Sequence, residues 1–379
     1  MSKILHILSG LLLPASLFAQ SSIMTKKATL PVEVRESSGL EWVAGGLWSF
    51  NDSGNPPFLF QLDSNDGTII KKVTIGNYGN TDWEDIASDS DYLYVGDFGN
   101  NDGNRKDLKV LRIPVASLMS LSDTTVDAEA IEFSYSDQTD FNPAGGTNFD
   151  CESMLAMGNS LYLFTKDRGD YHTRVYPLSK IPGTYSISSV ATFNSACLIT
   201  AADINPSQNT IALLAYSSGK TGSRIFLLSN FSGNAIFSGK IQDILLTPNA
   251  NGWQTEGLLF LSDERIFVSC EATSSYPSGL YSIDLPYLKS DPLSVGKLSN
   301  ADTIHLYPVP STGWVYISGM DEITSDSTLV MDPSGKQFTV PIRKEGRGSI
   351  AMDLSELPSG TYFLRLTSLP RRTYKIVRE

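Results

Sequence analysis

The chain has 379 residues, of which 41% are hydrophobic and 18% are charged, and this composition excludes a wholly disordered protein. The formal net charge is −12, and acidic and basic residues balance after residue 300, so the negative charge belongs to the region before it. An acidic region of this kind argues against nucleic acid as a partner and suits solubility or cation binding. The 30 Gly and 19 Pro lie between short apolar runs and predict an all-β chain rich in turns.

The first 19 residues have the features of an export signal. Lys3 supplies the positive charge, Ile4–Leu17 is an apolar run, and Ala19 is a small residue at the expected cleavage point. The apolar run is too short to span a membrane stably and is interrupted by Pro14. We therefore expect residues 1–19 to be a signal peptide, and we expect no membrane span once it is removed.

A two-strand pattern occurs five times along the chain. Its clearest copy is a short strand at Trp83–Ala87, a polar turn, a second strand at Tyr92–Gly96 and a loop rich in Gly and Asn. The other copies begin at Ser37, Cys151, Ala201 and Thr255. Repeats at intervals of about 46 to 68 residues are typical of solenoids and propellers.

One position is shared by all five copies, two residues before the first aliphatic residue of the first strand. We call the residues at this position the anchors, and they are Ser38, Glu84, Glu152, Ala202 and Glu256. Because equivalent inner strands of a closed ring face one axis, we expect the anchor side chains to converge there.

Four of the repeats also contain a third and a fourth strand. These are Phe58–Leu62 and Thr68–Ile75, Lys109–Ile113 and Ala130–Tyr135, Arg174–Leu178 and Ser186–Phe193, and Arg224–Leu228 and Ile236–Leu245. The fifth repeat has a third strand at Leu280–Leu285 but no fourth, and Ala28–Val34 can supply the missing strand from the other end of the chain. Residues 20–290 are therefore predicted to form a five-bladed β-propeller that leaves no long open edge.

The longest interval between anchors separates Glu84 from Glu152 and leaves room for a sixth blade as the less favoured alternative. Val115–Asn148 contains only one clear strand, so we interpret the excess as a long loop between blades. Residues 291–303 are read as a polar linker. Residues 304–379 are predicted to form a second, small Ig-like β-sandwich of short strands.

The second unit contains four motifs in a fixed order. They are Tyr307-Pro308-Val309-Pro310 with Gly313, Asp332-Pro333-Ser334-Gly335-Lys336, Leu357-Pro358-Ser359-Gly360-Thr361-Tyr362-Phe363-Leu364, and Lys375-Ile376-Val377-Arg378. On these motifs the unit resembles the type A C-terminal sorting domain of bacterial proteins secreted by the type IX system, with Val309 where that family usually has Asn. The resemblance implies that residues 304–379 engage the type IX machinery. It also implies export through the periplasm and outer membrane, followed by release or attachment at the cell surface.

The anchors also resemble the inner-strand residues of the five-bladed calcium-activated apyrases, in which Ser and Glu side chains surround one central calcium. Four anchors match that pattern, namely Ser38, Glu84, Glu152 and Glu256, whereas Ala202 does not. Independently of this resemblance, like-charged pairs at roughly 6 Å repel by about 3 kcal/mol at an effective dielectric constant near 20. A cation or protonation must relieve such repulsion, and hard oxygen ligands favour Ca²⁺. The alternative is that backbone amides and water bind the carboxylates.

A second polar set follows the second inner strands, where loops meet at one mouth of the propeller. Its members are Asn51, Asp52, Asp97, Asn100, Asn101, Lys166, Asp167, Arg168 and Glu271. The ligand-binding residues that we predict in this region are Asp52, Asp97, Asn100, Arg105, Lys166, Arg168 and Glu271. Arg105, Lys166 and Arg168 suit a phosphate or a carboxylate. The alternative is that these are ordinary turn residues.

Aromatic residues and cysteines beside the inner strands admit two interpretations each. Trp48, Trp83 and Trp253 either stack against a ligand or fill the wedges between blades. The three cysteines, Cys151, Cys197 and Cys270, are either buried thiols or include a Cys151–Cys197 disulfide of an oxidising compartment. No Ser–His–Asp order, nucleotide-binding Gly loop or His-based metal motif is present in the sequence.

The leading interpretation is an exported or cell-surface propeller that binds a cation or a small ligand in its central channel. One alternative is a metal-dependent hydrolase of phosphate esters or anhydrides, and another is a surface adhesion protein without catalysis. Metal content and turnover distinguish the three.

Overall fold

The computed structural model describes residues 20–120, 122–205, 209–217, 221–247, 253–285, 305–307, 310–318, 328–332, 336–346, 349–366 and 373–379. The chain divides into two compact units between Lys289 and Ser290. The predicted signal peptide and the predicted linker lie outside the described residues. Among the residues that are described, no helix is long and apolar enough to cross a membrane.

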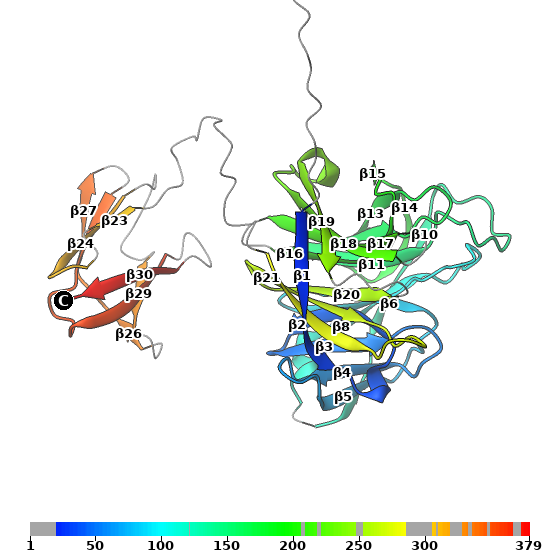
Figure 1. Ribbon diagram of the computed structural model, residues 1–379, viewed down its shortest axis with the longest axis horizontal. Helices are drawn as coiled ribbons and strands as arrows, with labels where there is room; N and C mark the ends of the chain where they lie inside the picture. The colour runs from blue at the N-terminus through cyan, green and yellow to red at the C-terminus, as the bar shows by residue number, and fades with distance from the viewer. Residues whose placement is uncertain are drawn as a thin grey trace, which may run out of the picture. The chain divides into compact units, whose positions relative to one another are not determined.

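The first unit is a propeller of five blades (Figure 1). Blade 1 consists of β2 (Ser37–Val43), β3 (Gly46–Asn51), β4 (Phe58–Leu62) and β5 (Ile69–Ile75). Blade 2 consists of β6 (Trp83–Ser88), β7 (Tyr92–Asp97), β8 (Lys109–Pro114) and β10 (Glu129–Tyr135). Blade 3 consists of β11 (Cys151–Met157), β12 (Ser160–Thr165), β13 (Thr173–Ser179) and β15 (Ala191–Phe193). Blade 4 consists of β16 (Leu198–Asn205), β17 (Thr210–Ser217), β18 (Thr221–Ser229) and β19 (Lys240–Thr247). Blade 5 contains β20 (Thr255–Ser262), β21 (Arg265–Cys270), β22 (Gly279–Asp284) and β1 (Gln20–Thr29).

The five blades close into a ring. The inner strands β2, β6, β11, β16 and β20 each contact the next one, and β20 contacts β2 again. Five separate apolar clusters fill the wedges between neighbouring blades; Phe50 and Trp83, for example, join blades 1 and 2. This arrangement confirms the five-bladed prediction and excludes the six-bladed alternative. The long interval between the anchors Glu84 and Glu152 is occupied by β10, the short strand β9 (Thr124–Val126) and the 3-10 turn η2 (Val115–Met119).

An N-terminal strand closes the ring, as predicted, but it lies earlier in the sequence than Ala28–Val34. In β1, Met24–Thr29 pairs antiparallel with β22 of blade 5, and Gln20–Ile23 pairs parallel with β19 of blade 4. Figure 1 shows β1 in dark blue beside these later strands. The strand ends before Pro31, which has no N–H to donate to a ladder, and the 3-10 turn η1 (Val32–Val34) follows.

Two predicted fourth strands are wrong in detail. Ser186–Phe193 is not one strand, because β14 (Gly183–Ile187) pairs parallel with β10 of blade 2, and only β15 belongs to blade 3. The unpaired outer edge of a blade accepts the next segment that passes it, and β9 pairs with β5 in the same way. Ile236–Leu245 is divided at Gly239, where a Cβ would lie 2.1 Å from the carbonyl oxygen of Ser229. A 3-10 turn, η3 (Ile236–Ser238), precedes this glycine.

The second unit is a sandwich of two four-stranded sheets. One sheet has the order β23 (His305–Tyr307), β24 (Trp314–Ser318), β28 (Ser349–Asp353) and β27 (Ile342–Gly346), and the other β26 (Gln337–Phe338), β25 (Thr328–Met331), β29 (Gly360–Leu366) and β30 (Thr373–Arg378). Val315 and Ile350 of the first sheet pack in one cluster with Val330 and Leu364 of the second, which confirms the predicted sandwich. The Tyr362 hydroxyl donates to the carbonyl of Pro358 at 2.8 Å and fixes the entry into β29.

Candidate functional site

Every inner strand carries a β-bulge near its first residue. The pairing register shifts between Ser37 and Leu40, Trp83 and Ile86, Cys151 and Ser153, Ile199 and Ala201, and Thr255 and Gly257. A bulge redirects a side chain out of the regular alternation. The residues within these bulges include Ser38, Glu84, Glu152 and Glu256, so four anchors occupy one equivalent position around the ring.

The fifth anchor is Thr200, and the prediction of Ala202 is wrong. Met154 and Ala202 each lie one residue past the register shift of their strand, and the N–H groups of both donate to Asp85, so the two residues are equivalent. Met154 lies two residues after Glu152, so the equivalent of Glu152 lies two residues before Ala202. The shift was not visible in the sequence because Ile199 and the alanines after Thr200 obscure where the apolar alternation begins.

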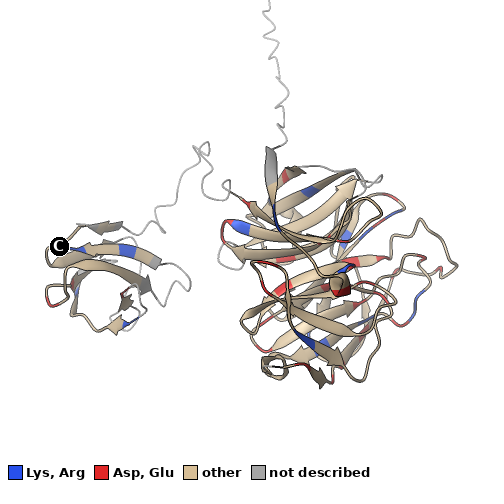
Figure 2. Ribbon diagram, turned by 60° about the horizontal axis from the view of Figure 1, so that its bottom comes forward, with Lys and Arg blue, Asp and Glu red and all other residues tan. Residues whose placement is uncertain are grey.

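A cavity of about 470 Å³ lies at the end of the ring where the inner strands begin and the second strands finish. Its lining residues are Asp52, Glu84, Asn101, Glu152, Lys166, Arg168, Leu198, Tyr216, Gln254 and Glu256. We call it the axial cavity. Figure 2 marks the acidic and basic positions on the ribbon of the propeller. All of its lining residues except Leu198 have polar side chains, and four of these side chains are carboxylates.

Glu152 is held by two cations. Its Oε2 lies 2.8 Å from Nζ of Lys166, and its Oε1 lies 3.6 Å from a guanidinium nitrogen of Arg168. Arg168 also pairs with the buried Asp150. Burial lowers the pKa of Lys166, but the charges of Glu152 and Glu256 outweigh burial and hold that pKa above its ordinary value. Lys166 is therefore a buried ammonium that compensates the acids around it.

Glu256 has one carboxylate oxygen without a partner among the described residues. Its Oε1 accepts a long hydrogen bond of 3.5 Å from the Tyr216 hydroxyl, while Oε2 is buried and makes no hydrogen bond. Burial raises the pKa of Glu256 to about 7, against the opposing charge of Lys166. Beside it, Gln254 donates to Glu271 at 2.7 Å, and burial raises the pKa of Glu271 to about 9.

Three further acids gather on one side of the axial cavity. One carboxylate oxygen each of Asp52, Asp82 and Glu84 lies within 4.8 Å of the others. Burial, with the neighbouring charges, raises the pKa of Asp52 to about 6 and that of Asp82 to about 7, and it raises the pKa of Glu84 well above its usual range. Gly99 makes this approach possible, because a Cβ there would lie 2.2 Å from Glu84 Oε1.

The hydroxyl anchors connect neighbouring inner strands. Ser38 donates to the backbone carbonyl of Glu84 at 2.7 Å, and Thr200 donates to that of Thr255 at 2.6 Å. Among the four metal ligands predicted from the sequence, Glu84, Glu152 and Glu256 line the axial cavity together. Ser38 is buried and is not among the lining residues.

Three predicted ligand-binding residues belong to a loop network instead of the cavity lining. Asp97 pairs with Arg105 at 2.9 Å and with Lys109 at 3.5 Å. The N–H of Asn100 donates to Asp150 at 2.7 Å, and its side-chain oxygen accepts from the N–H of Arg105 at 2.9 Å. These contacts shape the loop after β7. Asp52, Lys166 and Arg168 line the cavity, and Glu271 lies beside it through Gln254.

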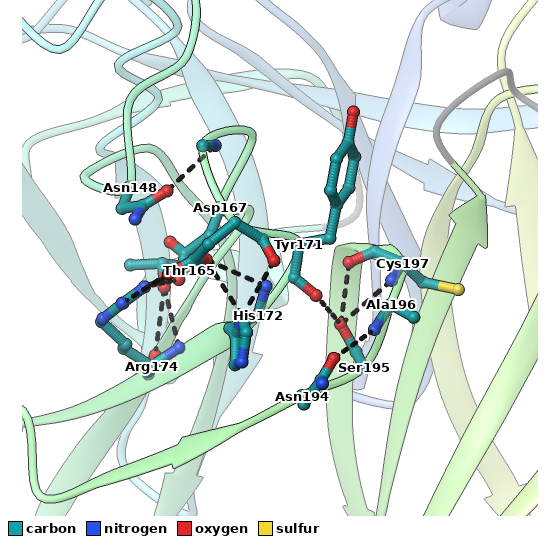
Figure 3. A network of polar contacts seen from close by, with 12 residues as sticks. Asn148, Thr165, Asp167, Tyr171, His172, Arg174, Asn194, Ser195, Ala196 and Cys197 are labelled. Carbon is teal, nitrogen blue, oxygen red and sulfur yellow. Dashed lines mark hydrogen bonds and ion pairs between the residues drawn. The ribbon is translucent and has the colours of Figure 1, made fainter.

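Asp167 belongs to a separate network around the loop that joins β12 to β13. Arg174 pairs with Asp167 and, at 2.7 Å, with Asp170, whose backbone carbonyl lies 2.8 Å from Nδ1 of His172 (Figure 3). The same view shows Ser195 bonded to the backbone of Tyr171 and Cys197. These contacts fix this loop and pair Asp167 through Oδ2, while its buried Oδ1 makes no hydrogen bond among the described residues.

Buried carboxylates cross-link the inner strands further along the ring. Asp85 accepts from Ile86 in its own strand, from Met154 in β11 and from Ala202 in β16. Asp203 accepts from Phe260 in β20 at 2.6 Å. These bonds tie four of the five inner strands together.

Sequence reasoning missed Asp82, Gln254 and Tyr216. A usable signal exists for each. Asp82 and Gln254 lie two residues before an anchor, and Tyr216, the residue before the last in β17, occupies the position that corresponds to Lys166.

The tryptophans fill wedges between blades, and the cysteines are buried thiols. Trp48 and Trp83 are fully buried in the wedge between blades 1 and 2, and Trp253 is buried between blades 4 and 5. Cys151, Cys197 and Cys270 are buried free thiols, so the structure contains no Cys151–Cys197 disulfide.

Comparisons with known proteins identify the second unit. Residues 305–378 match the family described as the secretion system C-terminal sorting domain. This match confirms the type IX sorting assignment made from the four motifs. The protein is therefore exported, and it is secreted or located at the cell surface. No curated protein matches the chain.

The chain is also similar in structure to two fungal enzymes. An α-L-arabinanase of Penicillium chrysogenum is 9% identical, with a TM-score of 0.41 over 71% of this chain and 99% of the other. An exo-β-1,3-galactanase of Phanerochaete chrysosporium is 10% identical, with a TM-score of 0.41 over 88% and 90%. Similarity this low transfers no activity, and the fold assignment rests on the strand order. The predicted similarity to calcium-activated apyrases has no support in these comparisons.

Proposed function

We propose that the propeller is an exported binding protein whose axial cavity takes up a small ligand rich in hydrogen-bond donors, either hydroxyl or ammonium groups. One observation carries the proposal. Glu256, which is 4% exposed, lines a cavity of the size typical for small-molecule sites, about 300–1,000 Å³, and its buried Oε2 makes no hydrogen bond among the described residues. A buried acceptor without a partner costs free energy that a donor from a ligand recovers.

The balance of groups in the lining supports a donor-rich ligand. Four carboxyl groups line the cavity, and each contributes only acceptors once it is ionised, which for Asp52 and Glu256 requires a pH above about 6 and about 7. Both cations of the lining, Lys166 and Arg168, already pair with Glu152. An anionic ligand such as a phosphate ester would therefore compete with Glu152 and meet the other acids. A neutral polyol or an amine meets no such repulsion.

Thermal-shift and calorimetric titrations against three sets of compounds test the proposal. The sets are neutral mono- and disaccharides, polyamines, and phosphate esters with inorganic phosphate as their simplest member. A member of the first or second set should bind the secreted protein. The identity of that set decides between hydroxyl and ammonium donors. Glu256→Gln should weaken binding by about tenfold or more, since an amide replaces one acceptor with a donor.

Glu33→Gln serves as the matched control, because Glu33 is exposed in the turn η1 and is not among the lining residues. It should bind like the wild type. Binding of phosphate esters alone, with turnover, would instead favour the metal-dependent hydrolase. Binding that survives unchanged in Glu256→Gln would refute the axial cavity as the site.

A further inference from the structure

We propose that Asp52, Asp82 and Glu84 form a Ca²⁺ site in the wall of the axial cavity. Three carboxylate oxygens within 4.8 Å of one another can be spanned by one ion with Ca–O distances of about 2.3–2.6 Å. The site differs from the ring of four anchors expected from the sequence. It shares only Glu84 with that set. Its other two ligands are Asp82, which lies just before β6, and Asp52, which follows β3.

The state of Glu84 is the independent observation that points to a ligand. Glu84 is 4% exposed and lines the cavity, yet among the described residues its carboxylate forms no hydrogen bond and no ion pair. The Asp82 carboxylate likewise has no such partner there, and Asp52 accepts only the N–H of Ser53. Three neighbouring acids with so few donors are what a cation would neutralise.

The backbone leaves room for these oxygens at one residue. Gly99 follows β7, and a Cβ at this position would lie 2.2 Å from Glu84 Oε1 and 2.5 Å from Asp82 Oδ2. Any other residue would push the two carboxylates apart. The cations near the cluster have other roles, because Arg105 pairs with Asp97 and Lys166 pairs with Glu152.

Ca²⁺ suits the site better than Mg²⁺. Asp52 comes from the loop after β3, whereas Asp82 and Glu84 flank the start of β6. Ligands from two separate segments give an irregular oxygen set that flexible Ca²⁺ coordination accepts and octahedral Mg²⁺ disfavours. Waters from the cavity can complete six to eight ligands. The inference does not depend on the small ligand, since the ion alone is tested.

The test is a titration of the metal-free secreted protein with Ca²⁺, followed by melting temperature and by terbium luminescence. A nearby tryptophan sensitises the luminescence of bound Tb³⁺, and Trp83 lies between Asp82 and Glu84 in sequence. Ca²⁺ should raise the melting temperature in proportion to the logarithm of its free concentration, and it should displace Tb³⁺. Mg²⁺ should do so only weakly.

Variants locate the effect. Glu84→Gln and Asp82→Asn should each weaken Ca²⁺ binding by at least about tenfold. Without metal, Glu84→Gln should melt at or above the wild-type temperature, because it removes a buried carboxyl group that must either repel two neighbouring acids or hold a proton, and this separates lost binding from lost folding. Glu33→Gln should keep the full response. A protein indifferent to Ca²⁺, an equal response to Mg²⁺, or an unchanged response in both site variants would overturn the inference.

Discussion

Lys166 is the residue on which the electrostatics of the axial cavity depend. It is 4% exposed, pairs with Glu152 at 2.8 Å and lies 5.3 Å from the centre of the Tyr216 ring. The ammonium is the buried positive charge that faces both Glu152 and Glu256. A cavity with several acids is tolerated because Lys166, together with Arg168 beside Glu152, offsets them.

Lys166→Met should therefore destabilise the propeller by about 3–5 kcal/mol, the usual cost of leaving a buried charge without its partner. Urea unfolding at neutral pH measures this change. Glu152→Gln in the same chain should recover part of the loss, because it removes the uncompensated carboxylate. A single variant as stable as the wild type would show that Arg168 or solvent, and not Lys166, neutralises Glu152.

Glu271 should make the stability of the protein depend on pH. Burial raises its pKa from 4.5 to about 9, so the folded protein holds a proton that the unfolded chain has lost between these values. Its contribution to stability therefore falls as the pH rises through this window. Glu271→Gln stays neutral and can still accept from Gln254. The variant should exceed the wild type in melting temperature near pH 9, and the difference should vanish towards about pH 5. Parallel profiles for the two proteins would contradict the assignment.

At the residue scale, the sequence predicted which residues face the axis of the ring better than it predicted their hydrogen-bond and ion-pair partners. The repeat identified Glu84, Glu152 and Glu256 because equivalent strands place equivalent residues on one axis. It misplaced one anchor, giving Ala202 instead of Thr200, because alanines hide the start of the alternation. Nothing in the spacing indicates that Arg168 pairs with Asp150 or that Asp97 pairs with Arg105, since those contacts depend on loop conformations that only the folded chain defines.

At the element scale, the bulge at the start of each inner strand links sequence to site. Five bulges in equivalent places turn one residue per blade out of its regular alternation, and three of these residues are glutamates that line the cavity. The inner and second strands were predictable from apolar alternation and turn residues. The partners of β1 and β14 were not, because pairing with a preceding blade or with two blades depends on which edges remain open.

Deletion of residues 20–29 should lower the free energy of unfolding by several kcal/mol, a large part of the stability of a typical domain. Without β1, strands β19 and β22 lose a shared partner and expose unpaired edges, and Met24 leaves the cluster between blades 4 and 5. Melting temperature and aggregation rate measure the effect. If the shortened chain melted like the wild type and stayed monomeric, β1 would not be what closes the ring.

At the scale of the whole molecule, the chain combines two units with separate cores. The sandwich has its own apolar cluster, and residues 305–378 match the sorting family. Short ordered motifs made this unit recognisable from sequence. The propeller carries no comparable motif, so its fold was predictable from the repeat, whereas its ligand was not.

Truncation after Lys297 should leave the propeller folded but retained in the periplasm. The reason is that the sorting unit supplies the export signal, while the five wedge clusters lie within the first unit. Cell fractionation of the native host and the melting temperature of the purified propeller measure the two outcomes. Arrival of the truncated chain at the cell surface would contradict the separation of roles.

The central claim is that the axial cavity is a binding site, and a crystal structure with the tightest-binding compound from the titrations and Ca²⁺ tests it most directly. The account predicts density for the compound in contact with the carboxylate of Glu256, and an ion bound by Asp52, Asp82 and Glu84. Density for the compound on the outer faces of the blades, with only water beside Glu84 and Glu256, would contradict it.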